Sequence, residues 1–150
     1  MIQRVQSLYL AGVLLCCILL YFFPIAAYNL GSETIKLYIT NVNNVSNSSV
    51  FFMYVIIILT ILIFIFSLIT IFKYKNRVLQ MRLTAFTFLF NALLIGFVFW
   101  LADRIQKEYG VITHYKVGLI FPLFALIFLV FANRAIKKDE EKVKAADRLR

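Results

Sequence analysis

The side chains with the most potential for chemistry are two cysteines, one histidine and one asparagine. Cys16 and Cys17 are adjacent, so they form no CxxC redox motif and are poorly placed for a normal disulfide. His114 is the only histidine and lies between apolar segments, whereas a membrane cytochrome needs paired histidine ligands and a rhomboid-like protease needs a histidine base. We therefore predict no enzymatic activity, no catalytic or metal site and no cofactor.

The long apolar segments hold no Asp, Glu, Lys, Arg or His in their hydrocarbon part. Proton- or sodium-coupled transporters generally need such a group, and its high burial cost makes it recognisable. A small four-helix multidrug exporter needs a glutamate in its first helix, and a quinone-linked thiol oxidase needs separated cysteine pairs. The sequence argues against all of these classes.

Four apolar segments make up most of the 150 residues. The chain is 63% hydrophobic, well above the apolar share of about 45–50% in soluble domains. As a helix, residues 50–72 would cover about 34 Å, slightly more than a hydrocarbon core of about 30 Å. Residues 8–28, 83–102 and 117–133 are the other candidate spans. The sequence predicts one all-α integral membrane domain, a four-transmembrane-helix bundle.

The two loops on one side of this bundle carry short β patterns. Residues 34–40 alternate between polar and apolar side chains, and residues 111–113, which follow Gly110, are all β-branched. If these segments pair, they form a small extracytoplasmic β element. Two irregular loops are the alternative.

Positive charges are concentrated on the other side. Lys and Arg resist translocation, so the side with more of them is expected to face the cytoplasm. Lys36, Arg104, Lys107 and Lys116 lie on the outer side, and the other twelve of the sixteen cations lie on the inner side. The sequence thus predicts that both termini are cytoplasmic and that residues 134–150 form a basic helical tail. The twelve are Arg4, Lys73, Lys75, Arg77, Arg82, Arg134, Lys137, Lys138, Lys142, Lys144, Arg148 and Arg150.

Nine of these cations are candidates for cytoplasmic docking or lipid contact. Anionic headgroups attract each nearby Lys or Arg by about 1 kcal/mol. An acidic partner, including ribosomal RNA at a translocation site, is the alternative, and the tail's four acidic residues weaken it. The nine are Lys73, Lys75, Arg77, Arg82, Arg134, Lys137, Lys138, Lys142 and Lys144.

Three residues within the spans are candidates for helix packing. Asn91 lies mid-span, where an interhelical hydrogen bond is worth about 0.6–2 kcal/mol. Gly96 would allow close helix approach, and Pro122 would kink the fourth span. Thr84 and Thr87 lie on a face similar to that of Asn91, or bond their own backbone instead.

The two ends of the chain resemble a known family. The opening MIQRVQSLYL and the closing FANRAIKKDEEKVKAADRLR, with four spans between them, resemble a Bacteroidota family of small inner-membrane proteins catalogued as a domain of unknown function. The resemblance covers essentially the whole chain and implies a multi-pass protein of a bacterial inner membrane. It supplies no catalytic residues. The arginines at the family's ends correspond to Arg4, Arg134, Arg148 and Arg150.

Two functions fit these features. The first is a non-enzymatic accessory or scaffolding subunit of a larger inner-membrane complex, in protein export or envelope biogenesis, with other inner-membrane proteins as partners. The second is a small carrier or channel for an apolar or uncharged solute, with Asn91, Thr87 and Pro122 lining its pathway.

Overall fold

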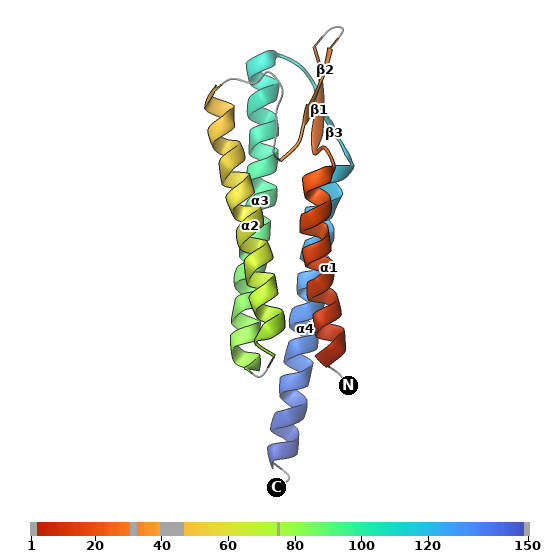
Figure 1. The fold of residues 1–150 in the computed structure, drawn as a ribbon, viewed down its shortest axis with the longest axis vertical. Coiled ribbons are helices and arrows are strands. Elements are labelled where there is room, and N and C mark those ends of the chain that lie inside the picture. Colours follow the sequence, from red (N-terminus) through yellow and green to blue (C-terminus); the bar gives the residue numbers. More distant parts are fainter. Residues whose placement is uncertain (1–2, 31–32, 40–46, 75, 149–150) are drawn as a thin grey trace.

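The structure, a computed structural model, describes residues 3–30, 33–39, 47–74 and 76–148. Four long helices lie side by side, with a small sheet at one end (Figure 1). The sheet defines the sheet end of the bundle, and the opposite end, where α1 begins and α4 ends, is the tail end. The helices are α1 (Gln3–Phe22), α2 (Asn47–Phe72), α3 (Arg77–Tyr109) and α4 (Ile120–Arg148), and a 3-10 turn, η1 (Val117–Leu119), precedes α4.

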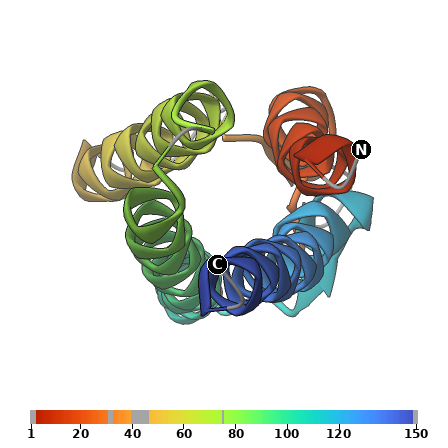
Figure 2. The same cartoon turned by 90° about the horizontal axis from the view of Figure 1, so that it is seen from below.

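The helices follow one another in chain order around a ring, and α4 closes the ring against α1 (Figure 2). α1 packs most extensively against α4, and α2 against α3, while the contact between α1 and α2 is less extensive. At the tail end α4 extends beyond the other helices (Figure 1), because residues 134–148 contain neither Gly nor Pro to end it. The bundle is therefore two helix pairs joined edge to edge.

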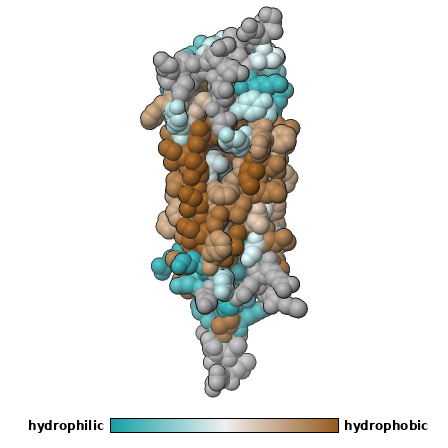
Figure 3. Space-filling model, viewed as in Figure 1, coloured by the Kyte–Doolittle hydropathy of each residue, from teal (hydrophilic) through white to brown (hydrophobic). Residues whose placement is uncertain are grey.

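The outer surface of the bundle is apolar. Leu8, Phe51 and Phe86 are each more than half exposed. Figure 3 shows a hydrophobic band around the middle, with hydrophilic residues gathered toward both ends. Each helix is long and apolar enough to cross a membrane, yet at most 33% of its span is buried inside the protein. These features indicate a multi-pass membrane protein whose band faces lipid.

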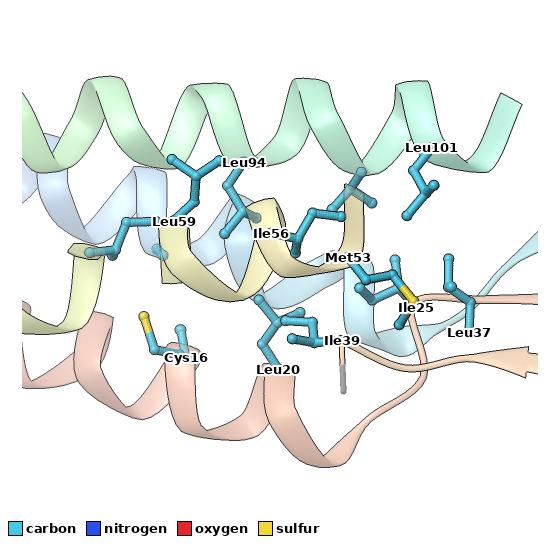
Figure 4. Packing of buried hydrophobic residues seen from close by; sticks show 14 of the residues in the cluster. Cys16, Leu20, Ile25, Leu37, Ile39, Met53, Ile56, Leu59, Leu94 and Leu101 are labelled. Carbon is cyan, nitrogen blue, oxygen red and sulfur yellow. The ribbon is translucent and has the colours of Figure 1, made fainter. Parts of the chain in front are cut away.

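The interior at the sheet end is filled by aliphatic side chains. Leu20 of α1, Ile56 of α2 and Leu94 of α3 are at most 3% exposed and point toward one another (Figure 4). Leu37, which ends strand β2 (Glu33–Leu37), and Ile39, just after that strand, extend the same cluster. Because lipid is as apolar as these side chains, their contribution within the bilayer comes from close packing rather than from removal of water.

The sheet has three strands, β1 (Ala26–Leu30), β2 (Glu33–Leu37) and β3 (Thr113–Tyr115), in the order β2-β1-β3. Both pairings are antiparallel, and Ala26 lies opposite Leu37 on one side and Tyr115 on the other. The predicted small sheet is confirmed. Its predicted pairing is wrong, since β1 lies between the other two strands, and residues 26–28 of β1 belong to the predicted first span.

The first helix ends at Phe22, six residues before the predicted limit of its span. Pro24 explains the early end, because proline lacks an N–H donor and biases the preceding residue away from helix. The extended chain that follows is paired on both sides: Ile25 N donates to Leu37 O over 2.8 Å, and Lys116 N donates to Ile25 O over 2.8 Å. Both hydrogen bonds fix the sheet to the end of α1.

Tyr28 fastens this sheet to α3. Its side chain is buried, and its hydroxyl donates to the carbonyl of Ala102 over 3.4 Å. Burial raises the pKa of Tyr28 to about 12, although a side-chain hydrogen bond with Thr113 opposes the shift. The phenol therefore stays protonated at neutral pH and remains a hydrogen-bond donor.

The kink predicted at Pro122 is absent, because a helix begins just before this residue. Because α4 begins at Ile120, Pro122 lies in its first turn. The first N–H groups of a helix have no intrahelical acceptor, so a proline there removes no helical hydrogen bond.

The backbone of η1 closely approaches the chain that follows α1. Gly118 N donates to Pro24 O over 3.0 Å. A Cβ added to Gly118 would lie 2.5 Å from Pro24 O and 2.8 Å from Phe23 O. Only glycine fits this contact without a backbone shift.

Substitution of Gly118 by Ala should therefore destabilise the bundle. We expect Gly118→Ala to lower the free energy of unfolding by about 1–3 kcal/mol, the usual penalty for overpacking, measured by thermal unfolding in detergent. The matched control is Gly96→Ala, since a Cβ at Gly96 meets nothing within 4 Å and alanine favours helix. Equal melting temperatures of the two variants would contradict the close approach of Gly118 to Pro24.

Candidate functional site

A stripe of buried polar residues runs along the inner face of α3 in the half of the bundle nearest the tail end. Gln80, Thr84, Thr87 and Asn91 follow one another at spacings of four, three and four residues, and each is at most 3% exposed. This spacing places them on one helix face. Leu94 continues the same face toward the sheet end. The interior is thus polar in the tail half and aliphatic in the sheet half.

Two further polar side chains join this stripe from α2. Ser67 and Thr70 are completely buried. Thr70 donates to Phe66 O over 2.7 Å, which is a bond to its own helix. The threonines of α3 do the same: Thr84 donates to Gln80 O and Thr87 to Leu83 O, both over 2.8 Å. Such bonds satisfy a hydroxyl donor inside a membrane helix without tying two helices together.

Three amide side chains provide the bonds between helices. Asn91 Nδ2 donates to Pro122 O of α4 over 3.1 Å, and Gln80 Nε2 donates to Thr70 O of α2 over 2.9 Å. Near the tail end, Gln6 Nε2 of α1 donates to Ala135 O of α4 over 3.3 Å. These bonds link α3 to both of its neighbours and α1 to α4. The structure thus brings together two of the predicted packing residues, Asn91 and Pro122.

Two polar atoms of the stripe keep spare hydrogen-bonding capacity. Ser67 Oγ and Gln80 Oε1 are buried and have no partner among the described residues. Ser67 lies one turn before Thr70, whose carbonyl accepts the Gln80 amide. An unpaired polar atom away from water costs roughly 1–3 kcal/mol, so these two atoms mark the place where a water molecule or another polar group would be stabilised.

The centre of the bundle beside Asn91 is closed. The void there has a volume of about 10 Å³ and is bounded by residues of all four helices, including Cys16, Cys17 and Pro122. This is about the smallest space that holds one water molecule. Both cysteines are free and buried. Among the described residues, no group of three His, Cys, Asp or Glu side chains could hold a metal ion.

Gly96, the third predicted packing residue, lies on the outer face of α3. It lines an open groove of about 510 Å³ together with Ala92 and Trp100. Among the described residues, no other element approaches within 4 Å of a Cβ built at Gly96. A packing role for Gly96 therefore stays a prediction, and it would involve another molecule.

The predicted basic cluster divides into paired and unpaired cations. Arg77 Nε lies 3.1 Å from Asp139 Oδ2, with side chains 21% and 10% exposed. This Asp139 oxygen has no aligned hydrogen-bond donor in the described part of the chain, so the attraction is electrostatic. The pair connects the start of α3 to α4. Lys144 lies 3.4 Å from Glu140 on its own helix.

The remaining cations are exposed at the tail end, and Lys75 lies outside the described residues. None of them takes part in the ion pairs between described side chains. Surface cations at the edge of an apolar band are suited to anionic headgroups or to an acidic protein surface. They are Lys73, Arg82, Arg134, Lys137, Lys138 and Lys142.

Residues 2–149 match the model of a protein family described as a domain of unknown function, DUF4293. The chain belongs to this family. The match covers all four helices and the sheet, so the polar stripe and the basic tail end both lie within the DUF4293 domain. Comparisons with curated proteins and with solved structures found no match.

Sequence reasoning missed Gln80, Ser67, Thr70 and Gln6. Gln80 had a usable signal, because it continues the spacing of Thr84, Thr87 and Asn91 by one more turn. The others lie on different helices, and their place depends on how those helices rotate against α3. The sequence therefore indicated the face of the stripe but not its extent.

The pair between Arg77 and Asp139 should stabilise the tail end. We expect Asp139→Ala to lower the free energy of unfolding by about 1–3 kcal/mol, because it leaves a half-buried guanidinium without its partner. Asp103→Ala is the matched control, since Asp103 and its partner Lys107 are 54% and 75% exposed and such pairs contribute about 0.5 kcal/mol or less. Thermal unfolding in detergent compares the variants, and additive losses in an Arg77→Ala, Asp139→Ala double mutant would refute the coupling.

Proposed function

We propose that this protein is a non-enzymatic accessory or scaffolding subunit of a larger complex in a bacterial inner membrane, with a Bacteroidota source and with both termini in the cytoplasm. The observation that carries this proposal is the close packing of the bundle's centre beside Asn91. The amide of Asn91 is bonded to Pro122 O, and the void beside it measures about 10 Å³. A bundle packed in this way holds its helices together and leaves its outer surfaces for partners.

The cytoplasmic placement of the termini is supported by the distribution of charge. The beginning of α1, the turn between α2 and α3 and the end of α4 lie at one end of the bundle (Figure 1). Together with the first two turns of α3 and the second half of α4, these segments carry twelve of the sixteen cations. The positive-inside tendency favours the cytoplasm for that end.

Scaffolding is supported further by the shape of the tail end. There α4 extends beyond its neighbours and carries exposed cations such as Lys137, Lys138 and Lys142 (Figure 1). We assign the complex to protein export or envelope biogenesis, since such assemblies need membrane subunits that position partners without handling a solute themselves.

A pull-down at native expression level tests the proposal. With a tag on the C-terminus and a mild detergent, mass spectrometry should recover a stoichiometric set of inner-membrane proteins. Recovery of the protein alone, or only with copies of itself, would overturn the scaffold hypothesis.

A carrier or channel for an uncharged solute is the second candidate. The observation that favours it is the pair of unpartnered polar atoms, Ser67 Oγ and Gln80 Oε1, inside the tail half. A small neutral solute with hydroxyl or amide groups could satisfy both atoms. Its passage would require the closed centre at Asn91 to open.

Substitution of Asn91 separates the two functions. As a packing residue, Asn91→Leu should lower the free energy of unfolding by about 0.6–2 kcal/mol and loosen the complex, with glycerol permeability of proteoliposomes unchanged. If Asn91 is a pathway residue, Asn91→Leu should change glycerol flux and leave the melting temperature unchanged.

Thr87→Val is the control, because Thr87 is buried on the same face but bonds only its own helix. It should leave stability and assembly nearly unchanged. Glycerol flux should also stay unchanged if the protein is a scaffold, and should change if Thr87 lines a carrier pathway. If Asn91→Leu retains normal assembly, stability and flux, neither role holds for that residue.

A further inference from the structure

A groove between α3 and α4 differs from two other grooves on the lipid-facing surface. It has a volume of about 300 Å³, at the lower end of the range of about 300–1,000 Å³ for small-molecule sites. Thr84, Ala85 and Phe88 line it from α3, and residues 129, 130, 133 and 134 line it from α4.

The groove is amphipathic along its length. Phe88, Leu129 and Val130 make one part of its lining apolar, and Asn133 and Arg134 make the other part polar and cationic. The groove on the outer face of α3 and the groove between α1 and α2 contain no charged lining residue among the described side chains. Of these three grooves, the one between α3 and α4 is therefore suited to a molecule with an anionic head and an apolar chain.

The cationic part of the groove lies where the apolar band ends. Two interactions fix the level of the antiparallel helices: Arg77 lies beside Asp139, and Asn91 bonds Pro122 O. Counting along both helices between these two contacts places Arg82 of α3 and Arg134 of α4 at the same height along the bundle axis. Both arginines directly flank uncharged apolar segments, so this level corresponds to the lipid headgroups, and Phe88 lies deeper in the hydrocarbon.

Arg134 is available to an anion. It is exposed, and no ion pair between described residues involves it. Lys137 and Lys138 follow within the next helical turn, while Glu141 is the nearby exposed acid. The opening of the groove thus keeps a positive balance. Arginine binds phosphate oxygens through two parallel N–H donors, and the Asn133 amide offers another donor.

We propose that this groove binds one anionic phospholipid from the leaflet at the tail end. Arg134 and Asn133 hold its phosphate, and one acyl chain lies along Phe88, Leu129 and Val130. The lipid would fill the outer seam between α3 and α4, on the side of the polar stripe that faces the membrane. This site is independent of whether the protein acts as a scaffold or as a carrier.

Native mass spectrometry of the delipidated full-length protein tests the site. Palmitoyl-oleoyl phosphatidylglycerol should bind with a stoichiometry of one and more tightly than the zwitterionic phosphatidylcholine with the same chains. Arg134→Gln should weaken phosphatidylglycerol binding by about fivefold, the effect of one cation near a headgroup, and should leave phosphatidylcholine binding unchanged.

Two matched controls distinguish lipid binding in the groove from nonspecific electrostatic and hydrophobic association of lipid with the protein. Arg82→Gln removes the same charge at the same level outside the groove lining and should cause a clearly smaller loss. Ala85→Phe fills the groove and should abolish the single phosphatidylglycerol site, whereas Ala92→Phe, in the other groove of α3, should not.

Several results would overturn the proposal. Equal binding of the two lipids would remove the role of charge, and equal losses from Arg134→Gln and Arg82→Gln would reduce it to diffuse attraction. Displacement of the lipid by inorganic phosphate, or normal binding to Ala85→Phe, would show that the acyl chain does not occupy the groove.

Discussion

A polypeptide inside a bilayer has to satisfy its backbone hydrogen bonds within the protein, and this constraint governs the whole structure. It makes helices of segments rich in Ile, Val and Phe, such as α2, which would favour strands in water. It also places the extended chain after Pro24 in a sheet, where β2 and β3 pair both edges of β1. Where Asn91 introduces an extra amide into the bundle, its donor is bonded to Pro122 O on a neighbouring helix.

The same constraint explains why the interior is divided. In the sheet half, Leu94 and Ile56 pack in an aliphatic cluster that continues to Leu37 of β2 (Figure 4). In the tail half, hydroxyls are bonded mainly within their own helices, while Gln80 and Gln6 connect neighbouring ones. Aliphatic packing and amide bonds are therefore alternative means of holding helices together where lipid offers no hydrophobic driving force. The polar interior of the tail half leaves the Oγ atom of Ser67 without a hydrogen-bond partner among the described residues.

Much of the architecture was predictable, because length and hydropathy decide whether a segment spans a membrane. The four helices followed from local sequence, which also indicated two strand-like segments but left open whether they join a sheet. The pairing of β1 did not, since its AAYNL sequence continues an apolar run and resembles the end of a span. The partners of Asn91 and Arg77 lie 31 and 62 positions away. Hydropathy contains no information on helix rotation or level, so those contacts needed the structure.

The tail-end cations show why composition alone misjudges a charged surface. By sequence, Arg77 and Arg134 are equivalent positive residues beside apolar spans. In the structure, Arg77 faces Asp139 and holds the turn before α3 against α4, so its charge is used within the protein. Arg134 lies at an open groove with Asn133 and remains available to an outside anion. A residue's contribution to orientation in the membrane needs only its charge, whereas binding needs that charge beside an unfilled, shape-matched space. Arg134 meets both requirements and Arg77 meets only the first.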